Sequence, residues 1–224
     1  MAAPDGLMPA VHLNLMKETL RAVTLCAVVT ALTPWLAAEP PSAGQELLLQ
    51  LDPAKSGADI TLSASMHTVH GSFSVKRGAV HFNPATGKAS GEIVIDAASG
   101  QTGNSSRDNK MHKDVIQSQR YPEIVFHPDR ADGTLSTSGD STLQVHGSFV
   151  IHGVEHEVTF PVRVNLAGTT WTAKASFQVP YVKWGMRSPS VLFLRVSDMV
   201  QVQFHAAGKI AQQSPGSLSS ENPR

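Results

Sequence analysis

The chain has 224 residues, of which 41% are hydrophobic and 16% are charged, and its formal net charge at pH 7 is zero. This composition is typical of a globular protein and excludes extensive disorder. Because 18 basic residues are balanced by 18 acidic ones, the chain as a whole has no net positive charge that would favour binding to nucleic acid or to an anionic membrane surface.

Residues 1–38 are predicted to form a signal peptide. Basic residues precede an apolar run from 22 to 32, and the small pair Ala37-Ala38 follows it, which is the order of charged, hydrophobic and cleavage regions in such signals. The run is shorter than the ~20 residues that a membrane span needs. We therefore expect cleavage after Ala38 and a periplasmic or secreted protein, with Met16 as an alternative start. The only cysteine, Cys26, lies in this segment, so we expect no disulfide in the mature protein.

One β-domain is predicted over residues 46–210, between a Pro/Ser/Gly linker at 39–45 and a polar, disordered tail at 211–224. Apolar and polar residues alternate there in runs that are separated by turn motifs such as Asp132-Gly133. An alternation with period two indicates strands with one buried and one solvated face. Many such antiparallel strands close into a barrel or stack into a sandwich.

The apolar phase of these strands is expected to face one continuous interior. It includes six large side chains, which are Phe126, Phe160, Trp171, Phe177, Val202 and Phe204. Five histidines each adjoin an apolar-phase residue and should therefore face solvent; they are His70, His81, His127, His146 and His205. Only His112 and His156 are placed to reach the mouth of a barrel, so no metal site is expected.

A single helix is predicted to interrupt the strands from Ser105 to about Gln119. Ser105 and Asp108 resemble a capping box, and Tyr121-Pro122 should end the helix. Two interpretations of Arg107 and Asp108 remain open. They either offer hydrogen-bond donors to a phosphate or other polar head at a barrel mouth, or form an ion pair and cap that fix the helix to the sheet. The structural interpretation is slightly favoured.

An apolar segment follows the strand that contains Phe177. It comprises residues 184–186 and 191–194, flanked by Arg187 and Arg195. Such a segment either dips into a membrane or covers the lumen as a lid, or it is a buried strand with its turn. We favour the buried strand, because short apolar runs most often have that role.

Three motifs between residues 107 and 158 resemble those of a known protein family. They are Arg107-Asp108 followed by a histidine, the stretch Tyr121-Pro122-Glu123-Ile124-Val125-Phe126, and Ile151-His152-Gly153-Val154 leading into Val158. Together they resemble the YceI-like lipid- and polyisoprenoid-binding family over roughly residues 46–210. This resemblance implies a mainly β fold, a single antiparallel lipocalin-like β-barrel with one short helix packed against it.

The resemblance also implies a function. The protein is expected to be an exported carrier that binds a polyisoprenoid or similar long-chain lipid in the barrel lumen, with transient membrane contact and no cofactor beyond the lipid. The ligand would contact the six apolar-phase side chains, and Arg107 and His112 at the mouth. The sequence does not indicate an oligomeric state.

Two other function classes stay open. One is an enzyme that acts on an isoprenoid lipid, with His112, Arg107 and Asp108 at the barrel mouth. The sequence contains no nucleophile elbow, phosphate loop or zinc-binding His-Glu-x-x-His motif, so we do not expect catalysis. The other is a structural or interaction barrel that is packed solid. Small residues such as Ala173 and Ala175 beside Phe177 favour a cavity instead.

Overall fold

The computed structural model describes residues 46–190 and 195–211. The predicted signal peptide with Cys26, the linker, the apolar stretch 191–194 and the tail after residue 211 lie outside the described residues. No helix in the described part of the chain is both long and apolar enough to cross a bilayer.

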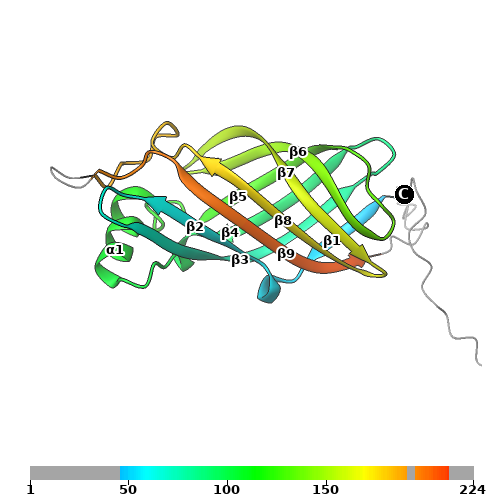
Figure 1. Cartoon of the computed structure of the whole chain (residues 1–224), viewed down its shortest axis with the longest axis horizontal. Coiled ribbons are helices and arrows are strands. Elements are labelled where there is room, and N and C mark those ends of the chain that lie inside the picture. The colour runs from blue at the N-terminus through cyan, green and yellow to red at the C-terminus, as the bar shows by residue number, and fades with distance from the viewer. Residues whose placement is uncertain (1–45, 191–194, 212–224) are drawn as a thin grey trace, which may run out of the picture. The chain divides into compact units, whose positions relative to one another are not determined.

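The described residues form an antiparallel sheet that closes into a barrel (Figure 1). Its strands are β1 (Leu47–Leu51), β2 (Gly57–Ser63), β3 (Thr68–Phe82), β4 (Ala89–Asp96), β5 (Glu123–Asp132), β6 (Gly139–Ile151), β7 (Val154–Ala167), β8 (Thr170–Val179) and β9 (Val200–Ala211). Neighbours from β4 to β9 pair in chain order, and the pairing of β3 with β4 closes the barrel. The predicted single antiparallel barrel with a short helix is confirmed.

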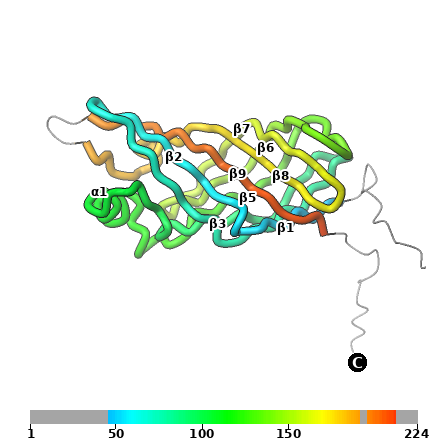
Figure 2. Tube along the Cα trace, turned by 60° about the horizontal axis from the view of Figure 1, so that its bottom comes forward, coloured from blue at the N-terminus to red at the C-terminus, as the bar shows by residue number. Residues whose placement is uncertain are grey.

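Two short strands share one position in this barrel. Both β1 and β2 pair with β3 on one side and with β9 on the other, and Figure 2 shows them one after the other between these long strands. The 3₁₀ turn Pro53–Lys55 separates them, and the Asp52 carboxylate caps this turn by accepting a hydrogen bond from the Ala54 amide at 3.1 Å. The barrel therefore has eight strand positions.

Irregularities in β3 and β5 change which residues face the interior. The register of β3 shifts between Val75 and Arg77, and that of β5 shifts between Pro128 and Arg130. An extra residue reverses the alternation of the strand that follows it. The alternation on the C-terminal side of each shift therefore cannot be extrapolated from the N-terminal side.

The helix begins at Ser105 as predicted, but its N-cap and its C-terminal end differ from the prediction. The α-helix α1 covers Ser105–Lys110 and continues into a single π-helical turn, η3, at Met111–Val115, so it ends earlier than Gln119. Its N-cap is Asn104, whose side-chain oxygen accepts a hydrogen bond from the Arg107 amide at 3.0 Å. The expected capping box of Ser105 with Asp108 is wrong, because Ser105 is already helical and the Asp108 carboxylate accepts from Thr102 instead.

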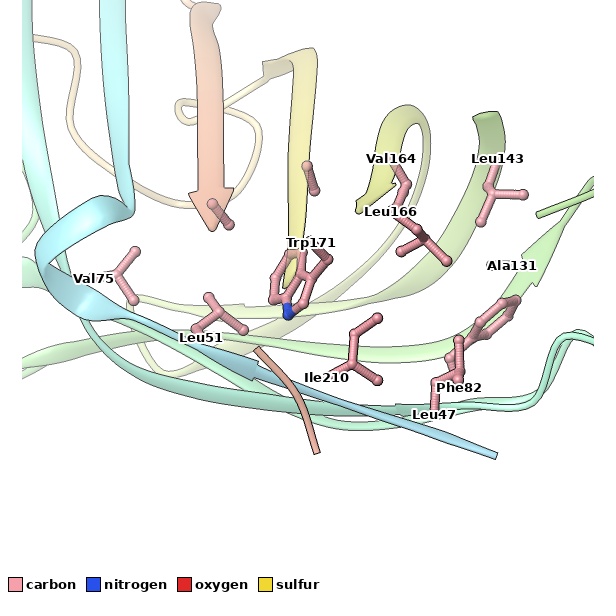
Figure 3. Close-up of a cluster of buried hydrophobic side chains, with 12 residues drawn as sticks. Leu47, Leu51, Val75, Phe82, Ala131, Leu143, Val164, Leu166, Trp171 and Ile210 are labelled. Carbon is pink, nitrogen blue, oxygen red and sulfur yellow. The ribbon is translucent and has the colours of Figure 1, made fainter. Parts of the chain in front are cut away.

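Buried apolar side chains pack together at one end of the barrel (Figure 3). Trp171 and Leu166 are only 4% and 3% exposed, and they pack with Leu47, Phe82 and Ile210. The indole Nε1 of Trp171 also donates to the Lys209 carbonyl at 3.2 Å. Because this cluster joins the first, third, seventh, eighth and ninth strands, it holds the closure of the barrel together.

Candidate functional site

A cavity of about 610 Å³ occupies the barrel interior. Its walls are almost entirely aliphatic and aromatic, and they include side chains from every strand and from α1 and η3. This volume lies within the roughly 300–1,000 Å³ range of small-molecule binding sites. The interior is therefore not packed solid, as the alternative of a ligand-free structural barrel had required.

Aromatic side chains form the middle of the cavity wall. The ring of Phe160 lies 4.3 Å from that of Phe177 and 5.4 Å from that of Phe126, and Phe149 lies 4.8 Å from Phe126. These separations are typical of favourable aromatic pairs, so this part of the wall is well ordered before any ligand binds. Next to it the wall is made of small residues, which are Ala173, Ala175 and Ala206.

The cavity opens at the end that carries α1. Most of its polar lining residues lie there, on α1 and the segments around it; they are His67, Thr102, Asn104, Ser106, Arg107 and Lys110. Asn104, Ser106, Lys110 and His67 are exposed to solvent, which shows that the cavity reaches the surface between α1 and the β2–β3 turn. At the opposite end, the lining residues among those described are all buried or half-buried.

Thr102 holds Arg107 at this opening. The Arg107 guanidinium donates from Nε to the Thr102 hydroxyl at 2.7 Å and from Nη2 to the Thr102 carbonyl at 2.8 Å. The Asp108 carboxylate accepts from the amide of Thr102 at 2.9 Å and also from its hydroxyl. Arg107 and Asp108 thus bind the same residue rather than each other. Arg107 and Asp108 therefore do fix the helix in place, as the structural interpretation expected, but through Thr102 and not through an ion pair with each other.

The structure places the residues predicted to contact a ligand as follows. Seven of them line the cavity, namely Phe126, Phe160, Trp171, Phe177, Val202, Phe204 and Arg107. His112 is not among the lining residues. Its ring nitrogens lie 2.8 Å from the Gly100 carbonyl and 3.0 Å from the Ser118 hydroxyl. His112 therefore ties η3 to the chain around it, and neither a ligand contact nor the catalytic role of the enzyme alternative gains support from its position.

His156 has a structural position as well. Its ring stacks on that of Trp184 with a centroid separation of 4.3 Å and an interplanar angle of 2°, and Trp184 lines the cavity. Nε2 of His156 is buried and has no hydrogen-bond partner among the described residues. Burial lowers the pKa of His156, so the neutral ring is the form that packs here.

The remaining histidine predictions concern the outer wall. None of the five histidines assigned to it lines the cavity; for example, His146 bonds the Asp132 carboxylate at 2.8 Å and His81 bonds that of Glu46 at 3.1 Å. Within the described part of the chain no group of three or more histidine, cysteine, aspartate or glutamate residues could hold a metal ion.

Sequence analysis missed several residues of the wall. Phe73, Phe149, Tyr181 and Met186 line the cavity and are buried. The alternation of β3 and β6 could have indicated the two phenylalanines. Tyr181 and Met186 lie in an irregular segment, where their placement depends on tertiary contacts such as the hydrogen bond from the Tyr181 hydroxyl to the Ser197 carbonyl at 2.8 Å. Residues 184–186 belong to a turn region from which Trp184 and Met186 line the cavity. The rest of that apolar segment, 191–194, lies outside the described residues, so its interpretation as a buried strand stays a prediction.

Known proteins resemble this chain in sequence and in structure. The family model described as the YceI-like domain matches residues 49–207. BcnA of Burkholderia cenocepacia is 24% identical with a TM-score of 0.59, over 71% of this chain and 99% of that one. A polyisoprenoid-binding domain from Saccharophagus degradans, implicated in plant cell wall breakdown, is 18% identical with a TM-score of 0.56, over 75% and 99%.

A YceI protein of Campylobacter jejuni is also 18% identical, with a TM-score of 0.52, over 66% of this chain and 88% of that one. No curated protein sequence matches the chain. At these identities the likeness to solved structures establishes the barrel fold and leaves the ligand open.

Proposed function

The chain belongs to the YceI-like domain family, and from this premise we propose that it is an exported carrier that binds a polyisoprenoid or similar long-chain lipid in the barrel lumen. The observation that carries the proposal is the cavity of about 610 Å³, which has apolar walls and a single polar end. A long hydrocarbon chain with a small polar head has the same division of polarity. The S. degradans neighbour, which is named as polyisoprenoid-binding, supports the same class of ligand.

The cavity volume sets the length of chain that fits. An apolar cavity of about 150 Å³ accommodates benzene, so each carbon atom needs roughly 25 Å³. By this proportion a cavity of 610 Å³ holds on the order of 20–25 carbon atoms, which corresponds to four or five isoprene units. A longer chain would leave part of its length outside the opening.

Apolar contacts with the cavity wall are enough to bind a lipid, and no reactive side chain is needed. Each methylene that leaves water for an apolar wall contributes about 0.8 kcal/mol. A lipid that comes from a bilayer is already out of water, however, so the lumen has only to match the hydrocarbon environment of the membrane. A carrier of this kind can load and release its ligand by exchange, and the alanine and aromatic surfaces of this cavity are sufficient for that.

The sharpest test uses two adjacent positions on β8. Phe177 lines the cavity, whereas Gln178 is exposed on the outer wall. Phe177→Asp should lower the amount of a prenol of four or five isoprene units retained after gel filtration by about tenfold or more, because a carboxylate in an apolar tube must be hydrated or protonated. Gln178→Asp adds the same charge outside and should retain the lipid as the parent protein does.

Circular dichroism must show that both variants fold, so that general destabilisation is excluded. Equal retention by two folded variants would mean that the lipid does not occupy the lumen. Native mass spectrometry and lipid extraction of the protein from its own compartment should then identify the chain length. N-terminal sequencing of exported material tests export separately: a mature N-terminus after Ala38 supports it, and one at Met1 or Met16 contradicts it.

A further inference from the structure

The large apolar side chains that are most exposed among the described residues gather at one end of the barrel. They are Met66, Val154 and Met199, which are 82%, 50% and 39% exposed. Met66 lies in the β2–β3 turn, Val154 begins β7 after the β6–β7 turn, and Met199 immediately precedes β9. These segments surround the opening of the cavity. The opposite end, where the apolar cluster of Figure 3 lies, exposes no comparable side chain within the described ranges.

Backbone contacts join two of these segments into a continuous rim. The amide of Ser65 donates to the Arg195 carbonyl at 2.9 Å, and Ala64 pairs with Val196 as an antiparallel bridge. The turn that carries Met66 is therefore held against the strand that leads to Met199. On the other side of the opening, the ammonium of Lys110 on α1 lies 3.5 Å from the Pro189 carbonyl.

The same rim carries exposed positive charge. Its exposed basic residues are Lys110, Lys113, Arg120, Lys183, Arg187 and Arg195, and its exposed acidic residues are Glu155 and Asp198. None of these basic residues belongs to an ion pair within residues 46–190 and 195–211. The net charge of zero for the whole chain thus conceals a local excess of cations at the opening.

On the outer wall, one group of charged side chains is joined by ion pairs. Glu123 accepts hydrogen bonds from Lys76 at 2.8 Å and from Arg77 at 2.9 Å, and Arg77 also binds Glu92 at 3.1 Å. Arg77 and then Lys76 hold the pKa of Glu123 at about 2. The charges of this wall cluster are therefore neutralised by neighbours on adjacent strands, whereas the basic residues of the rim form no ion pair among the described residues.

We propose that this rim docks on a bilayer that contains anionic phospholipid, with Met66 and Met199 entering the headgroup region and the rim cations contacting lipid phosphates. Apolar side chains at the surface combined with basic neighbours are the features that bind proteins to a membrane interface. The orientation would direct the cavity opening toward the membrane. This step rests on the proposed function, since a lipid carrier must load its cargo there, but the docking itself is measured without cargo.

The shape of the rim favours a bilayer over a protein partner. Stable protein interfaces bury about 800 Å² on each side around a packed apolar centre from which lysine is depleted. Here the apolar residues are single side chains on separate segments, and the basic residue Arg195 is held against the turn that carries Met66. Single apolar tips enter a fluid headgroup layer easily, whereas they leave gaps against a rigid protein surface.

Vesicle co-sedimentation of the mature protein without cargo tests the proposal. The parent protein should bind phosphatidylcholine vesicles that contain phosphatidylglycerol and should bind pure phosphatidylcholine vesicles much more weakly. Met66→Asp should weaken binding to the anionic vesicles by about tenfold. It replaces an apolar side chain that would enter the headgroup region with a negative charge that the anionic lipids repel. Arg195→Glu should weaken it by about fivefold or more, and added salt should reduce the difference.

Lys88→Glu is the matched control, because Lys88 is exposed in the β3–β4 turn at the closed end and gives the same change in net charge as Arg195→Glu. It should bind within about twofold of the parent protein. Equal weakening by Lys88→Glu and Arg195→Glu would overturn the proposal, because net charge and not the rim would then govern binding. No binding of the parent protein to anionic vesicles would also overturn it and would leave a protein partner as the rim's occupant.

A second measurement separates this proposal from the proposed function. The same variants are loaded with prenol from detergent, which needs no vesicle. If Met66→Asp and Arg195→Glu retain prenol as the parent protein does but lose vesicle binding, both proposals hold. If all variants bind vesicles and only Phe177→Asp loses prenol, docking by this rim is wrong and the carrier function stands. If prenol is never retained while the rim variants lose vesicle binding, the carrier function alone fails.

Discussion

The two ends of the barrel differ in the size of their buried apolar clusters and in their use of hydrogen bonds. At the closed end, Trp171, Leu166 and Ile210 are at least 93% buried, and they pack with Leu47 and Phe82 from strands that are distant in the sequence. At the open end, hydrogen bonds of Arg107 and Asp108 to Thr102 position a short helix, and a smaller apolar cluster that includes Phe73 and Ile116 packs beside it. Apolar burial contributes most of the stability of a fold, whereas a few hydrogen bonds position a segment without adding much to it.

This difference divides the molecule into a part that keeps it folded and a part that can change. Regions with few buried apolar contacts open locally at a lower free-energy cost than the packed core does. A carrier needs such a region, since its ligand has to pass the opening while the barrel stays closed. Variants at the two ends should therefore affect different observables.

The largest expected effect is at the closed end. Trp171→Ala should lower the free energy of unfolding by about 3–5 kcal/mol, because Trp171 is 4% exposed and its removal leaves a cavity. It also removes the hydrogen bond to the Lys209 carbonyl. Urea denaturation followed by circular dichroism measures this loss.

Trp184→Ala provides the comparison with the open end. Trp184 is the same residue type but half-buried, and it packs against His156. Its loss should cost only about 1–2 kcal/mol, close to the contribution of an aromatic pair. A cost for Trp184→Ala as large as that for Trp171→Ala would show that stability is spread evenly along the barrel.

The sequence predicts the walls of uninterrupted strands well. The inward phase of Phe160 and Phe177 follows from period-two alternation, because neither β7 nor β8 contains a register shift. The presence of a cavity is harder to predict from the sequence. Ala173 and Ala175 indicate missing volume, but whether their partners fill that volume depends on the width of the closed barrel.

Other features could not be predicted, because they depend on contacts between distant segments. A single extra residue in β3 or β5 reverses the inward phase without changing the local composition. The position of His112 on the helix was visible in the sequence. Its direction was not, since it depends on the π-helical turn and on the Gly100 carbonyl to which it bonds.

An intermediate effect is expected for the residue that holds α1. Thr102→Val keeps the shape of the side chain but removes the hydroxyl that accepts from Arg107 and donates to Asp108. The loss should be about 1–2 kcal/mol, since hydrogen bonds to charged groups contribute more than neutral ones. Hydrogen exchange should become faster in α1 and stay unchanged in β8. Faster exchange in both segments would mean that α1 and the barrel open together.

The smallest expected effect is a change in pH dependence at the open end. The pKa of His156 is lowered from 6.5 by burial, so below pH 6.5 the unfolded chain takes up a proton at this residue more readily than the folded protein does. Acidification through this range therefore favours unfolding, and the contribution of His156 to stability is fully present only above pH 6.5.

His156→Phe should remove this dependence while keeping a ring against Trp184. Unfolding free energies of the parent protein should fall more steeply between pH 7.5 and pH 5.5 than those of the variant, by a fraction of the ~1.4 kcal/mol per pH unit that one proton can contribute. His127→Phe, on the exposed outer wall, controls for the loss of one imidazole. An equal flattening of the curve in both variants would place the pH response in the number of histidines and not in the buried ring beside the cavity. A flattening confined to His156→Phe would assign this part of the acid response to the buried ring that stacks on Trp184 in the cavity wall.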